Sequence, residues 1–182
     1  MKTSHLTSIF NKINSEITLP QYLQEICNII DKGDSISKRI DAILFDYDIN
    51  DSISKVDFLQ LIFAYIKISL EDGILTIHER EDIKFLKTVF RIQSGDFFFH
   101  NRLDVEHTIA LELSKIYEDN FITEEEAEFK IGIQEIFDLS FDQMNNYSKS
   151  KAIVSIKEGA DVKDLDIFFT YDEYFKVRSE VK

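Results

Sequence analysis

The sequence predicts an all-α protein, a helical bundle of about seven or eight helices with a short C-terminal appendage. Two observations predict this fold. The 182 residues include one proline and five glycines, so few residues interrupt long helices. Apolar residues recur three and four positions apart along most of the chain, which is the spacing of a helix that buries one face. Hydrophobic residues make up 44% of the chain, enough for a packed core.

Three helices are expected in residues 1–53. The first is expected near residues 3–15, the second follows Pro20 and ends at Gly33, and the third begins near Ser37. Their periodic apolar residues are Leu6, Ile9, Phe10, Ile13, Tyr22, Leu23, Ile26, Cys27, Ile30, Ile40, Ile43 and Leu44. A buried, inert thiol is expected at Cys27, which is the only cysteine.

Residues 54–147 are expected to form the larger part of the bundle. Ser54 with Asp57 resembles a capping box that starts one helix, and Thr76 with Glu79 starts the next. The segment SGDFFFHN between these helices and the following one is the clearest expected loop. Its three consecutive phenylalanines cannot share one helix face, so we expect some of them to fill the core.

An internal repeat appears when residues 71–92 and 118–139 are aligned with a shift of 47. Both copies carry Glu-Asp before the turn, then a threonine and a glutamate three residues later, Thr76 with Glu79 and Thr123 with Glu126. This D-G/N-x-[ILV]-T-x-x-E turn between apolar helices resembles the TerB-like family of tellurite-resistance and stress-response modules.

The resemblance covers about residues 55–145, and the N-terminal fifty and C-terminal forty residues lie outside it. The expected helical bundle spans residues 1–147, with N-terminal helices in 1–53 and a duplicated TerB-like core in 54–147. For that core the resemblance implies a compact all-helical bundle. It further implies no known catalytic machinery, and acidic surface clusters suspected of binding cations.

Residues 148–182 form the expected C-terminal appendage. AIVSI at 152–156 and DIFFT at 166–170 have strand-like composition and are separated by the turn-rich EGAD. Two structures remain open for them, a small β-hairpin or irregular segments that lie on the helical body.

The stretch ILFDYDINDSISKVDF matches a twelve-residue EF-hand loop in most positions. Oxygen ligands would come from positions 1, 3, 5, 7, 9 and 12, which are Asp46, Asp48, Asn50, Ser52, Ser54 and Asp57. Two departures weaken the match: Asp51 stands where the sharp turn needs glycine, and Asp57 replaces the usual glutamate, which favours Mg²⁺ over Ca²⁺. The alternative is a polar connector in which these side chains cap the neighbouring helix.

The formal net charge of −13 bears on partners. Such a charge repels phosphate backbones, so we expect no nucleic-acid binding, and it attracts a basic protein partner. Residues 112–142 hold ten acidic residues and two lysines, and a solvated helix face is the alternative explanation. The candidate partner-binding residues are Glu71, Asp72, Glu118, Asp119, Glu124, Glu125, Glu126 and Glu128.

The sequence lacks a phosphate-binding glycine loop and a nucleophile elbow, so we expect a protein that is not an enzyme. The most apolar stretch contains Gln60 and Lys67 and is too short to span a membrane, and the N-terminus does not resemble a secretory signal. The cytoplasm is the expected location. The expected function is a TerB-like stress or defence module that acts through its acidic turns, with Ca²⁺ or Mg²⁺ as a candidate ligand. The alternative is an acidic immunity protein that neutralises a basic toxin or nuclease.

Overall fold

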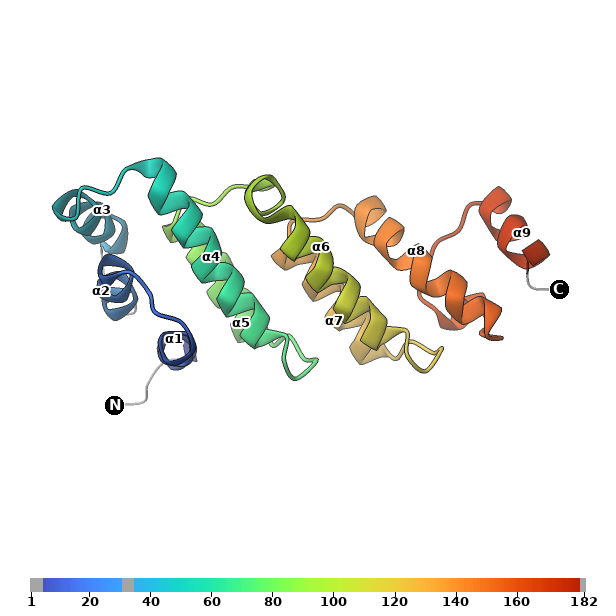
Figure 1. Ribbon diagram of the computed structural model, residues 1–182. Helices are drawn as coiled ribbons and strands as arrows, with labels where there is room; N and C mark the ends of the chain where they lie inside the picture. Colours follow the sequence, from blue (N-terminus) through green and yellow to red (C-terminus); the bar gives the residue numbers. More distant parts are fainter. Residues whose placement is uncertain (1–4, 31–34, 181–182) are drawn as a thin grey trace. The chain divides into compact units, whose positions relative to one another are not determined.

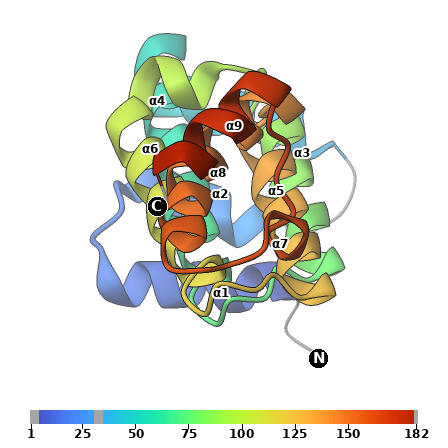
Figure 2. The same ribbon diagram turned by 90° about the vertical axis from the view of Figure 1, so that its right-hand side faces the viewer.

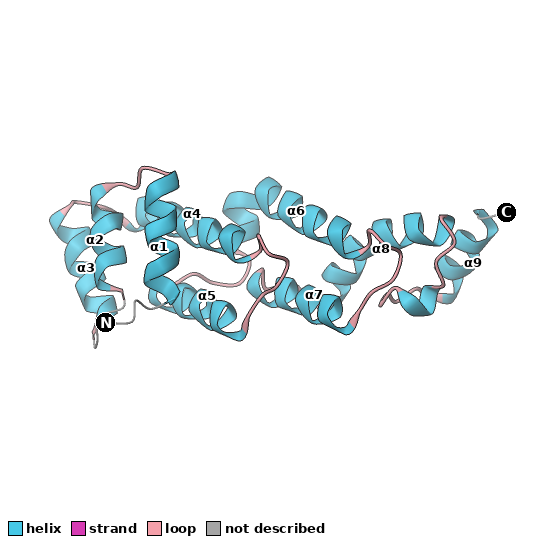
Figure 3. Cartoon of the chain, turned by 90° about the horizontal axis from the view of Figure 1, so that it is seen from below, coloured by secondary structure: helices cyan, strands magenta, loops and turns pink. Residues whose placement is uncertain are grey.

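The computed structural model describes residues 5–30 and 35–180, and over these residues the chain is helical with no strand (Figure 1, Figure 3). The all-α prediction is confirmed for this part of the chain, with more helices than the seven or eight expected. Residues 3–4 of the first expected helix and the expected stop at Gly33 lie outside the described residues. The helices are α1 (His5–Glu16), α2 (Gln21–Ile29), α3 (Ile36–Asp46), α4 (Asp51–Ser69), α5 (Ile77–Val89), α6 (Asp96–Ile116), α7 (Glu124–Ile136), α8 (Phe141–Lys157), a 3₁₀ turn η1 (Val162–Asp164) and α9 (Tyr171–Glu180).

The chain divides into two compact units, Met1–His100 and Asn101–Lys182. The division falls within α6, where Asn101 has a non-helical backbone (φ −130°, ψ 30°). This differs from the predicted division at residue 147, which lies inside the unbroken helix α8. Each unit is described by itself below.

The first unit is built around α4, which is buried on almost every side. Leu59, Ile62 and Ile66 have no exposed surface, and the ring of Tyr65 is equally enclosed. Helices α1 and α5 pack against α4, and α1 also contacts α2 (Figure 1). Each such aliphatic side chain contributes roughly 1.5–3 kcal/mol when it leaves water, so α4 is the main source of stability in this unit.

The SGDFFFHN segment is not the loop that the sequence suggested. Asp96–His100 form the first turn of α6, and the Asp96 carboxylate accepts a hydrogen bond from the backbone N–H of Gln93 at 2.7 Å. Phe97 is 1% exposed, which confirms that one of the three rings enters the core, whereas Phe99 is 83% exposed. A helical turn places neighbouring rings about 100° apart, so one ring faces inward while another faces solvent.

The second unit consists of α6 from Asn101 onward, α7, α8 and α9. Its core is formed mainly by α6, α7 and α8 together with Leu165, and α9, whose one buried residue among those described is Val177, contacts α8 (Figure 2). Its most deeply buried apolar side chains are Val105, Ile109, Leu113, Ile116, Ile133, Phe137, Met144, Ala152 and Leu165.

The C-terminal appendage contains no hairpin in its described residues. Residues 152–156 form the last turns of α8, with Ala152, Ser155 and Ile156 buried at helical spacing, so the strand-like composition was misleading. Residues 166–170 are irregular. The side chain of Asn145 holds this segment by accepting from the N–H of Phe168 at 3.0 Å and donating to its carbonyl at 2.9 Å. Of the two alternatives, the hairpin is wrong and the irregular segment on the helical body is confirmed for 166–170.

In the part of the chain that is described, every helix is too short or too polar to cross a membrane.

Candidate functional site

The two acidic turns of the repeat adopt the same local structure. Thr76 and Thr123 each accept a hydrogen bond from the backbone N–H three residues later, at 3.2 Å in both turns. Glu79 and Glu126 accept from the threonine N–H in return, at 2.8 Å in both turns. These reciprocal bonds are complete capping boxes, so the helix starts predicted at α5 and α7 are confirmed.

The residues before each threonine also match. Gly73 and Asn120 take the left-handed conformation, with φ of 74° and 66°. Asp72 accepts a hydrogen bond from the N–H of the residue two positions later at 3.0 Å, and Asp119 does the same at the same distance. The carboxylates of Asp72 and Asp119 therefore shape the turns, which is a structural role that needs no ligand.

A third copy of the turn lies in the second unit, where the sequence analysis placed strand-like residues. Thr170 and Glu173 exchange the same pair of bonds, at 2.9 Å and 3.4 Å, and Thr170 follows Thr123 by the same 47 residues that separate Thr123 from Thr76. Applying the shift of 47 a second time would have found this copy. The third turn departs from the other two before the threonine, where Asp166 takes the positive φ of 40°.

The eight candidate partner-binding residues divide into two groups. Glu71 forms an ion pair with Lys12 of α1, with Nζ and Oε2 2.5 Å apart, and this bond raises the pKa of Lys12. The carboxylates of Asp72, Asp119 and Glu126 accept hydrogen bonds from backbone N–H groups of their own turns, as described above. The other four are exposed, and their carboxylates bond to no other described residue; they are Glu118, Glu124, Glu125 and Glu128.

The four free glutamates lie in the second turn and the first turns of α7, next to an exposed aromatic ring. Phe121 is 50% exposed at the tip of this turn, and the equivalent positions hold Ile74 at 62% and Phe168 at 59%. Carboxylates at a helix start interact favourably with its dipole, so Glu124 and Glu125 also stabilise α7. We call Phe121 with the four free glutamates the acidic tip. The sequence analysis included the glutamates and missed Phe121, which falls on the unspecified position of the D-G/N-x-[ILV]-T-x-x-E turn.

The proposed metal loop has the structure of a helix connector. Asp46 is the last residue of α3, and Asp48 takes a left-handed φ of 53°. The N–H of Ile49 donates to the Leu44 carbonyl at 2.9 Å, and that of Asp48 donates to Phe45 at 3.1 Å, which together make a Schellman stop.

The same stop closes α5 and α7, where the left-handed residues are Arg91 (57°) and Asp138 (54°). The position of Asp48 is therefore filled by a cationic side chain in one of its equivalents. The turn needs a residue that tolerates positive φ, and it does not need a carboxylate.

Three of the other expected ligands lie at or within the start of α4. Asn50 caps α4 by accepting from the N–H of Ile53 at 3.0 Å, so the helix starts at the sixth position of the proposed loop. Ser52 and Ser54 are therefore helical, and the hydroxyl of Ser54 bonds to the Asp51 carbonyl. Within residues 5–30 and 35–180, no cluster of three or more His, Cys, Asp or Glu side chains is arranged to hold a metal ion.

Asp57 has a partner within the protein. Its carboxylate accepts a hydrogen bond from the hydroxyl of Tyr22 in α2. Burial, followed by this hydrogen bond, raises the pKa of Tyr22 above its ordinary value. Asp57 thus joins α2 to α4, which is a structural function for the twelfth position of the loop.

The described residues define an all-helical protein that contains repeated helical hairpins with matching turns. Comparisons of the chain with protein-family models, curated proteins and solved structures find no match. The resemblance to the TerB-like family stays an expectation drawn from the acidic turns.

Proposed function

We propose that this chain is a non-enzymatic binding protein that holds a basic partner protein at the acidic tip. The observation that carries the proposal is the contrast between the two equivalent glutamates. Glu71 is neutralised by Lys12, whereas its equivalent Glu118 has no counter-charge among the described residues, and neither have Glu124, Glu125 and Glu128. A surface that leaves four carboxylates uncompensated attracts a cationic surface and speeds its association.

Phe121 gives the acidic tip an apolar centre. Exposed aromatic residues surrounded by charged groups are common anchors of protein interfaces, because the ring buries a large area while the charges select the partner. A basic protein with a shallow apolar depression among lysines and arginines is the partner of matching chemistry.

Two specific functions are consistent with this surface. The first is a TerB-like stress or defence module, supported by the duplicated acidic turns. The second is an immunity protein that covers a basic toxin or nuclease, supported by the net charge of −13. An immunity protein inhibits its partner's activity in a one-to-one complex, and a stress module has no such effect, so an activity assay on the captured partner separates them.

The test is a charge reversal with a matched control. Glu124→Lys, Glu125→Lys and Glu128→Lys are combined in one variant, and Glu16→Lys, Glu81→Lys and Asp172→Lys in another. Both variants have the same net charge, and all six residues are exposed. We expect the first variant to lose a partner captured from cells that carry the gene, and the control to keep it.

A second measurement tests the electrostatic mechanism. The association rate with the captured partner is expected to fall steeply as salt rises from about 50 to 500 mM, because the Debye length shortens. Equal capture by both charge-reversed variants, or an association rate that salt does not change, contradicts the proposal.

A further inference from the structure

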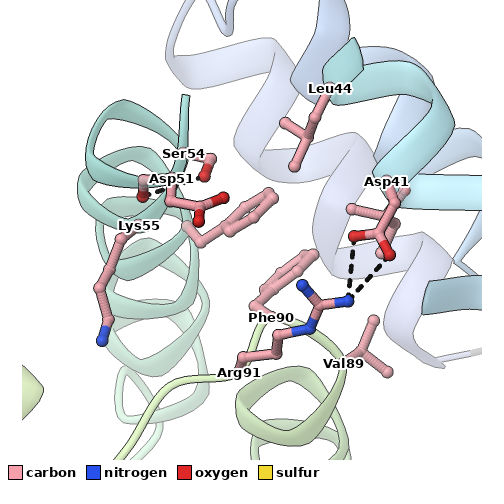
Figure 4. A pocket seen from close by; sticks show the side chains of 10 residues that line it. Asp41, Leu44, Asp51, Ser54, Lys55, Val89, Phe90 and Arg91 are labelled. Atoms are coloured by element: carbon pink, nitrogen blue, oxygen red, sulfur yellow. Dashed lines mark hydrogen bonds and ion pairs between the residues drawn. The ribbon is translucent and has the colours of Figure 1, made fainter. Parts of the chain in front are cut away.

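A small cavity of about 180 Å³ opens in the first unit where α3, α4 and the end of α5 meet (Figure 4). Its apolar lining includes Leu44, Val89 and the stacked rings of Phe58 and Phe90, whose centroids are 4.1 Å apart. These residues give the cavity a wall that fits an apolar group.

The charged groups of the cavity are only partly paired. Arg91 directs Nη2 to both carboxylate oxygens of Asp41, at 3.0 and 2.9 Å. Lys55 bonds Asp96 at 2.8 Å, and Figure 4 shows its ammonium pointing away from Asp51. Asp51 is left with a carboxylate that bonds to no other described residue.

Arg91 also keeps free donors. The two bonds to Asp41 use only Nη2, so Nη1 and Nε have no partner among the described residues. Arg91 comes from the end of α5 and Asp51 from the start of α4, and Figure 4 shows them on different sides of the cavity. The cavity thus offers a hydrogen-bond donor edge for a carboxylate and a separate acceptor for an ammonium group.

We propose that this cavity binds a free α-amino acid with an apolar side chain. The ligand's ammonium group bonds to Asp51, its carboxylate bonds to Arg91, and its side chain packs against Phe58 and Phe90. The volume lies below the roughly 300 Å³ of pockets for larger ligands, so the ligand is limited to about one amino acid. This inference does not depend on the proposed function, because the acidic tip lies in the other unit.

The test removes each charge from the ligand and from the protein in turn. L-leucine, N-acetyl-L-leucine and L-leucinamide are titrated into ¹⁵N-labelled full-length protein, and the amide signals of Leu44, Val89 and Arg91 are followed by NMR. We expect L-leucine to bind with a Kd on the order of 1 mM. Each derivative, which lacks one of the two charges, is expected to bind at least about tenfold more weakly, as for a lost hydrogen bond to a charged group.

The protein variants make the test specific. Asp51→Asn should weaken L-leucine about as much as acetylation does, and should not weaken N-acetyl-L-leucine further, because the same contact is already absent. Arg91→Gln should weaken the binding of L-leucine about as much as amidation of the ligand does, and should not weaken the binding of L-leucinamide further. Glu16→Gln, an exposed residue of α1, is the charge-matched control and should leave all Kd values unchanged.

Two results of this experiment would contradict the proposed amino-acid site. Loss of the charge-specific pattern, with L-leucine and N-acetyl-L-leucine binding equally, would overturn the proposal. Absence of any saturable shift with L-leucine would overturn it as well. An unchanged spectrum for the remaining amides of Asp51→Asn shows that this variant is folded, so a lost ligand is then a lost contact.

Discussion

Tyr65 donates its hydroxyl proton to Asp82 across 2.7 Å, which links the buried centre of α4 to α5. His5 of α1 lies 3.1 Å from the same carboxylate oxygen, so one aspartate connects three helices of the first unit. Tyr65→Phe removes the hydroxyl and keeps the packing of the ring. We expect the free energy of unfolding to fall by about 1 kcal/mol, measured by urea denaturation. Tyr171→Phe, at an exposed site, is the control.

The same contact gives the protein a pH dependence in alkaline solution. Burial, then the hydrogen bond to Asp82, raises the pKa of Tyr65 above its ordinary value of 10.0. The unfolded chain therefore loses this proton at a lower pH than the folded chain does. The contribution of this contact to the free energy of unfolding is complete below pH 10 and decreases as the pH rises above it. Tyr65→Phe should show a smaller decrease, and an identical decrease in both proteins would assign the effect to other groups.

Glu173 gives the opposite dependence in acid. A hydrogen bond from Lys149 at 2.7 Å, followed by bonds from Thr170, lowers the pKa of Glu173 to about 2. The contact is present above the ordinary value of 4.5 and is lost as the pH falls towards 2. Carboxyl ¹³C NMR of Glu173 measures the pKa directly. In Lys149→Met the pKa should move towards 4.5, and no movement would contradict the assigned cause.

The capping boxes predict equal effects at equivalent positions. Thr76→Ala and Thr123→Ala each remove the acceptor for one helix start and should cost about 1 kcal/mol of stability. Thr76→Ser and Thr123→Ser keep the hydroxyl and should restore most of it. Hydrogen exchange followed residue by residue should be faster in α5 of Thr76→Ala and faster in α7 of Thr123→Ala. Exchange that changes over the whole chain would mean that the turns do not act locally.

Calcium addition tests the connector interpretation of residues 46–57. Because α4 already begins at Asp51, we expect Ca²⁺ or Mg²⁺ to leave the Tm of chelator-treated protein unchanged. A ligand that bound the folded state would raise the Tm by mass action. A rise that disappears in the double variant Asp46→Ala with Asp48→Ala would show instead that a cation binds here.

The helices and the two acidic turns could be predicted because their signals are local. The amphipathic spacing and the S/T-x-x-E caps act within a few residues, and both boxes form as expected. The start of α4 was misplaced at Ser54 because two capping signals lie close together. Asn50 caps the helix, and Ser54 with Asp57 falls inside it. The third copy was missed because the shift of 47 was applied only once and the strand-like composition of residues 166–170 suggested a hairpin. For residues 152–156, packing within α8 overrides the same preference for strands.

The division of the acidic residues could not be predicted from sequence. Glu71 and Glu118 occupy equivalent positions, and only a contact with Lys12, distant in the chain, separates a neutralised glutamate from a free one. The cavity was equally hidden, since Asp51 starts α4 whereas Arg91 follows the end of α5, forty positions later in the chain. The metal prediction relies on spacing alone, and the same spacing suits residues that stop α3 and cap α4, so the Tm measurement with Ca²⁺ and Mg²⁺ decides between the two interpretations.

The positive-φ stops after α3, α5 and α7 have a consequence for how such a chain changes length. Each hairpin carries its own N-terminal cap and its own positive-φ stop. When a segment between two stops is gained or lost, the remaining helices therefore keep the residues that start and end them. Gene duplication or deletion by one whole hairpin is therefore far less damaging to folding than an insertion of a few residues within a helix.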